Sequence, residues 1–326
     1  MTESRFAFPE IDYAAHPYYA PFLAGIGETE RQAVWARFAA VHAEVAAQQK
    51  ACADFRLAHP HAETSRPAEL ETLDRDGILP LRLQASNLDA ILEVTAPFEA
   101  RLAEQRAGLE PERLAVAGAS LKICGPKDPE QAVFEELLAR YGVFELCRRH
   151  KGLPYRLKFV VLQHNAHSDQ GLSLVCSYDD KVRSPSFYAH IDSTVEAMKV
   201  IIYLTRDVTA ARGAFRYFPG SHLASGPEDL AIRKSNDRCG WEPVFEPANR
   251  RAFAALPAAF RRKANFGNDL LDPEAAGAVL SWERVLDSSG GDLLLFNTDG
   301  VHRGAMFDEP GERKILQLSL TPDLRA

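Results

Sequence analysis

The sequence has few cysteines, and they show no pairing pattern. Five occur among 326 residues, with no CxxC pair: Cys52, Cys124, Cys147, Cys176 and Cys239. Zinc knuckles and disulfide frameworks depend on closely spaced or evenly numbered cysteines. We therefore expect neither of them, and we expect a reducing, cytoplasmic compartment.

Long apolar runs and an excess of positive charge are also missing. No apolar stretch approaches the roughly 20 residues that span a bilayer, and the N-terminal MTESRFAFPEIDYAAHPYY lacks the pattern of a signal peptide. The formal net charge of -7 argues against nonspecific nucleic-acid binding. We expect a soluble monomer or homodimer that binds a small molecule and has neither a membrane nor a nucleic-acid partner.

Residues 1–150 are predicted to be mostly helical and to pack on a core formed by residues 151–326. Val34, Phe38, Val41 and Val45 recur at the spacing of one buried helix face, after a capping-box pattern at Thr29 and Gln32. Two further helices are predicted to start near residues 86 and 129, the second with proline at its first helical position.

From about residue 157 onward the sequence contains short runs rich in Val, Ile, Leu and Phe. These runs are LKFVVLQHN, VIIYLTR, GAFRYFPG, GDLLLFN and KILQLSL, bounded by Gly, Pro, Asn and Asp. Strands without regular βα alternation favour an antiparallel sandwich or barrel, of which the jelly roll is one solution. Residues 224–285 interrupt them with a helical, basic insertion, which is long enough to be a lid or substrate loop.

Three polar residues in the strand-rich half can hold a metal. Side chains two positions apart on a strand point the same way, so His190 and Asp192 can face one ion. His302 follows the apolar run GDLLLFN. Two histidines and one carboxylate form the facial triad of non-haem Fe(II) oxygenases, which leaves positions open for a co-substrate and O₂. Arg313, in the next strand, could bind a carboxylate through two parallel hydrogen bonds.

The same region resembles the phytanoyl-CoA dioxygenase-like family. ARGAFRYFPGSH is similar to the family's G-x-L-x-x-x-P-G-S-H segment, and GDLLLFNTDGVHRGAMF is similar to its G-D-x-x-x-F…H segment. Arg313 follows His302 by eleven residues, which matches the family's 2-oxoglutarate-binding arginine. The resemblance covers about residues 155–322. It implies a double-stranded β-helix core of the jelly-roll, cupin-like type, in a mainly β or α+β protein.

The resemblance also implies the cofactors and their ligands. His190, Asp192 and His302 would bind Fe(II), and Arg313 would bind the far carboxylate of 2-oxoglutarate, with O₂ as the second co-substrate. Many relatives carry a small hydroxyl residue two positions after the distal histidine, but here that position is Gly304. Another side chain must then help to hold the carboxylate, and the candidates are Gln163, Lys158 and Ser319.

Other polar residues are weaker candidates for contact with the substrate. Tyr188 shares its side of the strand with His190, and His164 could line the mouth of a barrel, although a surface or core role suits His164 as well. In the insertion, Arg261 and Arg262 belong to a basic cluster. This cluster either forms a solvated helix face or closes over an anionic substrate.

The predicted activity is that of an Fe(II)- and 2-oxoglutarate-dependent dioxygenase. It would hydroxylate an unactivated C–H bond of a small metabolite, with anionic metabolites among the candidates, and release succinate and CO₂. Desaturation, ring closure or epimerisation can follow the same hydrogen abstraction. Two alternatives stay open, namely a non-catalytic β-barrel protein that binds a small molecule and a cupin-like metalloenzyme that uses no 2-oxoglutarate.

Overall fold

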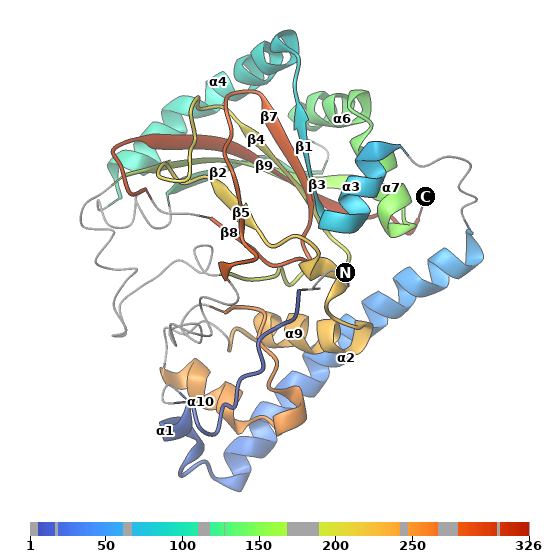
Figure 1. Cartoon of the computed structure of the whole chain (residues 1–326), viewed down its shortest axis with the longest axis vertical. Coiled ribbons are helices and arrows are strands. Elements are labelled where there is room, and N and C mark those ends of the chain that lie inside the picture. The colour runs from blue at the N-terminus through green and yellow to red at the C-terminus, as the bar shows by residue number, and fades with distance from the viewer. Residues whose placement is uncertain are drawn as a thin grey trace.

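The computed structural model describes residues 6–16, 19–60, 67–109, 118–126, 128–167, 189–241, 247–266, 280–304 and 307–325. Its centre is a pair of antiparallel β-sheets (Figure 1). The larger sheet has six strands in the order β1-β7-β4-β9-β3-β2, and the smaller has three in the order β6-β5-β8. The strands are β1 (Ile78–Arg82), β2 (Ala119–Cys124), β3 (Tyr155–Ala166), β4 (Met198–Tyr203), β5 (Phe215–Tyr217), β6 (Arg284–Leu286), β7 (Asp292–Asn297), β8 (His302–Arg303) and β9 (Glu312–Pro322).

Side-chain alternation gives each strand of the larger sheet two different faces. Along β9, Leu316, Leu318 and Leu320 point into the main core, whereas Arg313 and Ile315 point toward the smaller sheet. The main core lies between the larger sheet and helices α4 (Ala85–Ala107), α6 (Glu130–Arg140) and α7 (Val143–Lys151). The opposite face, turned toward the smaller sheet, is where polar side chains enter the interior.

The space between the two sheets is closed by a second apolar cluster. Tyr203 and Phe296 from the larger sheet pack with Phe215 and Tyr217 from the smaller one. His190 forms one isolated β-bridge with His302 and another with Asn265. These bridges extend the smaller sheet beyond β8. Residues 189–191, together with residues 264–266 of the insertion, therefore form one side of the smaller sheet.

Except for α3 (Ala68–Asp76), whose Leu73 belongs to the main core, the remaining helices lie away from it. They are α1 (Ala20–Leu23), α2 (Glu28–Ala58), α3 (Ala68–Asp76), α9 (Pro227–Cys239) and α10 (Pro247–Ala255), with the 3-10 turns η2 (Ser221–Leu223) and η3 (Ala258–Phe260). The long α2 packs against α9 and α10, so Phe38 contacts Ile232 and Trp241 in a separate core (Figure 1). The described parts of the insertion at 224–285 are thus largely helical.

Three details of the first half differ from the sequence prediction. The outer strands β1 and β2 come from residues 1–150, which pattern alone predicted to be helical. Helix α2 begins at Glu28 with Gly27 as its N-cap and no side-chain capping bond, so Thr29 lies inside the helix rather than capping it. Pro129 is the N-cap of α6 and not its first helical residue.

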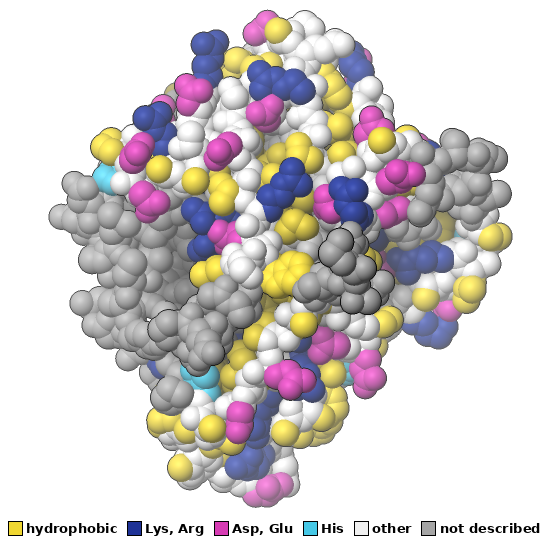
Figure 2. Space-filling view, in the orientation of Figure 1, with side chains coloured by type: hydrophobic (Ala, Val, Ile, Leu, Met, Phe, Trp, Pro, Cys, Tyr) yellow, Lys and Arg dark blue, Asp and Glu magenta, His cyan; other side chains and the backbone are white. Residues whose placement is uncertain are grey.

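The described surface mixes charges of both signs. Figure 2 shows Lys and Arg side chains interspersed with Asp and Glu side chains on the face that it presents. None of the helices described is both long and apolar enough to cross a membrane. The described cysteines, Cys52, Cys124, Cys147 and Cys239, are all buried and free.

Candidate metal centre

Backbone pairing brings the three predicted metal ligands together. His190 and His302 exchange two backbone hydrogen bonds, with N···O distances of 2.9 and 2.8 Å. The backbone N–H of Asp192 donates to the carbonyl of Thr298 at 3.0 Å. Since His190 and Asp192 are two residues apart, both side chains point from this edge of the smaller sheet toward the space between the sheets.

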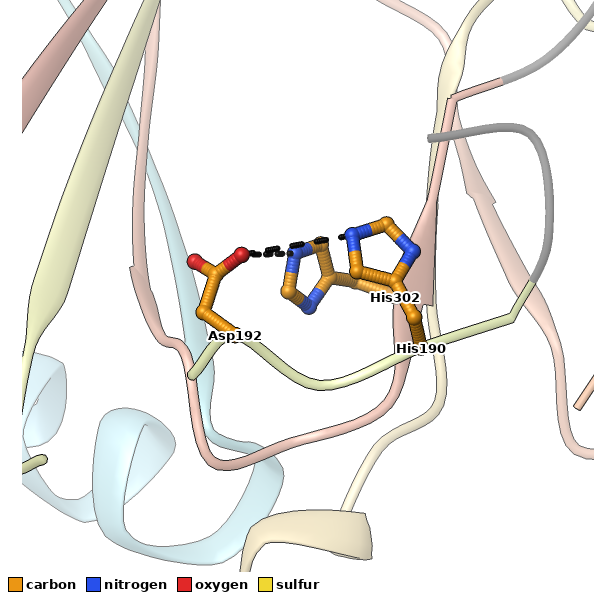
Figure 3. A group of neighbouring side chains, drawn as sticks. All are labelled: His190, Asp192 and His302. Atoms are coloured by element: carbon orange, nitrogen blue, oxygen red, sulfur yellow. Dashed lines mark ion pairs between the residues drawn. The ribbon is translucent and has the colours of Figure 1, made fainter. Parts of the chain in front are cut away.

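The ligand atoms of His190, Asp192 and His302 all lie within 4.8 Å of one another. Asp192 Oδ1 is 4.0 Å from His190 Nε2 and 3.8 Å from His302 Nε2, and the three side chains point toward one another in Figure 3. His302 Nδ1 lies 2.9 Å from the carbonyl of Gly300, which favours a proton on Nδ1 and leaves Nε2 as a lone-pair donor. One ion could therefore be held by two imidazole nitrogens and a carboxylate oxygen.

The electrostatics of the site favour the protonation states that bind a metal. Burial lowers the pKa of His302 to about 3, with a further contribution from the neighbouring His190. Burial alone would raise the pKa of Asp192, but the charges of Lys199, His302 and His190 outweigh it and hold that pKa well below its ordinary value. A neutral His302 and an ionised Asp192 at neutral pH are the forms that coordinate a cation.

Lys199 is a fourth polar group at this centre. Its Nζ lies 2.7 Å from Asp192 Oδ2, the carboxylate oxygen that does not face the histidines. The ion pair fixes the rotation of the carboxylate and leaves Oδ1 directed at the two imidazoles. Groups that orient a ligand in this way are a regular part of protein metal sites.

Arg313 lines the same cavity as His190 and His302. The cavity has a volume of about 90 Å³, and its walls are formed by residues of both sheets, including His190, Lys199, Tyr203, Phe215, Phe296, His302, Gly304 and Ile315. Arg313 is 5% exposed. Its guanidinium donates to the carbonyl of Gly213 and, at 3.1 Å, to Asn165 Oδ1.

The Arg313 guanidinium is a buried cation without a described acidic partner. Burial lowers the pKa of Arg313, and no carboxylate among the residues that the structure describes forms an ion pair with it. Arg313 Nε and Asn165 Nδ2 are both buried donors without an acceptor in the described part of the chain. An unpaired buried charge lowers the stability of the folded protein by roughly several kcal/mol. The surroundings of Arg313 therefore suit an anionic ligand.

The other predicted cofactor ligands are divided between two cavities. Gln163 lines the Arg313 cavity, where its Oε1 accepts a hydrogen bond from Gln317. Lys158 and Ser319 do not line it. They line a neighbouring cavity beside Asp192. Gln163 is therefore the one of the three that is placed to contact a ligand of Arg313.

The predicted substrate residues lie apart from the triad or outside the described residues. His164 alternates with Gln163 along β3, so its side chain is on the other face of the sheet, 2.9 Å from Glu312. Arg261 and Arg262 line a cavity on the outer side of the smaller sheet with Phe6 and other residues near the N-terminus. Tyr188 lies outside the described residues.

A buried network of charges supports the segment that carries Asp192. The ammonium of Lys234, on α9, donates to the carbonyls of Asp192 and Thr194 at 2.8 and 2.9 Å and lies 2.7 Å from Asp299 Oδ1. Asp299 also pairs with Lys151 of α7 at 2.6 Å. Lys234 is fully buried, and Asp299 is three residues from His302. The network thus connects the insertion and α7 to both metal-ligand segments.

Sequence reasoning missed Lys199 and Lys234. Lys199 occupies an inward position at the start of an otherwise apolar strand, MKVIIY, and a charge at such a position is a usable signal. Lys234 has no comparable signal, because a helical lysine is most often solvated and its burial here depends on the packing of α9 against α2.

Comparisons with known proteins give weak likenesses only. No protein-family model matches the chain, and no curated protein sequence matches it. A solved structure described as the non-heme alpha-ketoglutarate-dependent carbocyclase SnoK, from nogalamycin biosynthesis, is 14% identical, with a TM-score of 0.46 over 79% of this chain and 84% of that one.

Two other solved structures are similar at the same level. HygX from Streptomyces hygroscopicus, with nickel and 2-oxoglutarate bound, is 15% identical, with a TM-score of 0.44 over 79% of this chain and 88% of that one. The epimerase SnoN, also from nogalamycin biosynthesis, is 14% identical, with a TM-score of 0.42 over 78% of this chain and 82% of that one. At these values the likeness carries no argument about the function of this chain.

Proposed function

We propose that this protein is an Fe(II)- and 2-oxoglutarate-dependent oxygenase of the phytanoyl-CoA dioxygenase-like type. The observation that carries the proposal is a two-histidine, one-carboxylate triad whose histidines line one cavity together with a buried Arg313 that has no acidic partner among the described residues. A transition-metal site next to a buried guanidinium fits a ligand with a chelating end and a distant carboxylate, as in 2-oxoglutarate.

The strand order supports a double-stranded β-helix. From β3 onward the chain places β3, β4, β7 and β9 in the larger sheet and the His190 segment, β5, β6 and β8 in the smaller one. Successive strands thus alternate between the sheets singly or in pairs, and all the pairings are antiparallel. This alternation is the topology of a jelly roll.

Each residue of the centre has a separate role in the proposed reaction. His190, Asp192 and His302 would hold Fe(II), and Arg313 would bind the far carboxylate of 2-oxoglutarate with help from Asn165 or Gln163. Phe215, Phe296 and Ile315 form apolar walls that exclude water from the same cavity. The bound iron, 2-oxoglutarate and O₂ would supply the oxidation of a C–H bond, with release of succinate and CO₂.

Hydroxylation of a small metabolite is the outcome that we propose, and desaturation, ring closure and epimerisation are variants of the same chemistry. A non-catalytic binding protein has no need for a complete triad together with a buried arginine. A cupin-like enzyme that uses no 2-oxoglutarate would leave Arg313 without a ligand.

The test is anaerobic addition of Fe(II) and 2-oxoglutarate to the purified protein. We expect the weak visible charge-transfer band of the chelate. In Arg313→Ala the affinity for 2-oxoglutarate should fall about 100-fold, since a buried charge pair of roughly 3 kcal/mol is lost, while Fe(II) affinity stays unchanged.

Arg303→Ala is the matched control. Arg303 is on β8, the strand that precedes β9 along the chain, but it pairs with Glu283 at 2.6 Å instead of facing the cavity. It should leave the band intact. Absence of the band in folded wild-type protein would overturn the proposed function. Equal losses of iron and 2-oxoglutarate in Arg313→Ala would overturn the role of this arginine.

A further inference from the structure

A second cavity reaches the proposed metal centre from the other side of Lys199. It has a volume of about 220 Å³ and is lined by Asp192, Lys199, Lys158, Ser193, Thr194 and Ser319, among others. Asp192 of the triad lines this cavity, whereas His190 and His302 line the Arg313 cavity. The Arg313 cavity is smaller, at about 90 Å³.

We propose that this second cavity anchors an anionic group of the substrate, a carboxylate or a phosphate, between Lys158 and Lys199. The inference rests on the proposed function and adds the chemical class of the substrate to it. The volume corresponds to roughly seven water molecules at ~30 Å³ each, which is enough for such a group and a few attached carbon atoms.

The charges on the cavity wall favour an anion. Lys158 and Lys199 contribute two ammonium groups, and Asp192 contributes the single carboxylate among the described lining residues. A metal on Oδ1 of Asp192 would share that carboxylate with Lys199, which already contacts Oδ2. The wall is then net positive, and a cationic ligand group would be repelled by it.

The local backbone directs Lys158 to this place. The pairing of β3 with β9 shifts register between Leu157 and Phe159, so Lys158 has no partner residue opposite it. Such bulges commonly re-aim a side chain beside a functional site. Among the described residues no acidic side chain forms an ion pair with Lys158, so its ammonium is available to a ligand.

The hydroxyl groups on the wall provide the remaining donors. Ser319 lies opposite Phe159 on β9, and Thr194 lies two residues after Asp192, whereas the side chain of Ser193 already forms a hydrogen bond with Asp237. Hydroxyl and ammonium donors around one space make short, charge-assisted hydrogen bonds to carboxylate or phosphate oxygens. Lysine serves such groups as a point charge rather than through a paired, planar contact.

The experiment measures anion binding to the full-length protein loaded with Mn(II) and 2-oxoglutarate. Inorganic phosphate and acetate are titrated separately, and their ³¹P and ¹³C relaxation is followed, because the paramagnetic ion accelerates the relaxation of a nucleus that binds near it. We expect saturable, metal-dependent relaxation for at least one anion. The anion that binds more tightly identifies the phosphate or carboxylate class.

Lys158→Gln should weaken that binding about tenfold, the effect of losing one charge-assisted contact, while the affinities for Mn(II) and 2-oxoglutarate stay unchanged. Lys314→Gln is the control, since Lys314 lies on β9 but pairs with Glu99 at 2.9 Å and does not line the cavity. It should bind anions as the wild type does.

Two results would overturn the inference: no saturable binding of either anion to the loaded wild type, or equal anion affinity in Lys158→Gln and wild type. If 2-oxoglutarate binds and the anions do not, this inference fails and the proposed function stands. If 2-oxoglutarate itself does not bind, both fail together.

Discussion

Substitution of the buried Lys234 tests its contribution to folding stability and its contribution to metal binding in separate measurements. Its ammonium contacts two carbonyls of the Asp192 segment and the carboxylate of Asp299, all within 2.9 Å. Lys234→Met keeps much of the side-chain volume but leaves Asp299 with Lys151 alone. Removing one partner of a buried ion pair costs about 3–5 kcal/mol, so we expect the free energy of unfolding to fall by that amount.

The same substitution should also weaken metal binding, because the Asp192 carbonyl loses the donor that fixes its position. Changes to groups that orient a ligand typically reduce metal affinity about 10- to 100-fold. The assay is calorimetric titration of Mn(II) into folded protein, alongside urea unfolding of the metal-free form. Lys234→Gln, which keeps a donor but no charge, should give intermediate values in both measurements.

Lys263→Met provides the control, since Lys263 is also about 1% exposed and belongs to the same insertion. Its ammonium donates to the hydroxyl of Tyr19, which lies outside the metal-ligand segments. We expect lower stability with unchanged Mn(II) affinity. Equal losses of affinity in the two Lys→Met variants, or none in Lys234→Met, would refute the reasoning.

Three further outcomes are expected. Mn(II) at 100 times its Kd should stabilise the protein by about 2.7 kcal/mol in thermal or urea unfolding, and Asp192→Ala should abolish this gain. Asn165→Ala should weaken 2-oxoglutarate binding about tenfold in titrations, because Asn165 accepts from Arg313; unchanged affinity would exclude that role. Burial lowers the pKa of His222 to about 4. The contribution of His222 to the free energy of unfolding is therefore complete above pH 6.5 and declines by up to about 1.4 kcal/mol per pH unit as the pH falls toward 4. Unfolding curves of His222→Gln should lack that decline.

The part of the metal centre that depends on local geometry could be predicted from the sequence. His190 and Asp192 are two residues apart, and strand alternation alone places them on one face. His302 follows the apolar run of β7, and Arg313 comes just before the apolar run of β9. Their strands lie in different sheets, where β8 pairs with β5 and β9 pairs with β3 and β4. Their meeting in one cavity needed the chain order of the strands, which the resemblance supplied and composition did not.

The outer strands and the supporting Lys234 could not be found in this way. The segment of β1, ILPLR, contains a proline, which argues against an interior strand, and β1 is tolerated because it is an edge strand paired only with β7. Lys234 looks like an ordinary surface residue until distant segments pack around it. Burial of a charge depends on long-range contacts that no short sequence window contains.

The charges of the assembled centre point to the kind of substrate that completes it. In the proposed complex, a divalent iron and the two carboxylates of 2-oxoglutarate would cancel each other, and Asp192 would cancel only one of the two cations Arg313 and Lys199. One positive charge is then left over in a largely buried site, where an uncompensated charge is costly. A substrate with a single anionic group beside Lys199 would neutralise it, and Lys158 at the mouth would attract the same group from solvent. A neutral substrate would leave the excess unpaired, so the charge balance agrees with the anionic substrate proposed from the lining of the second cavity.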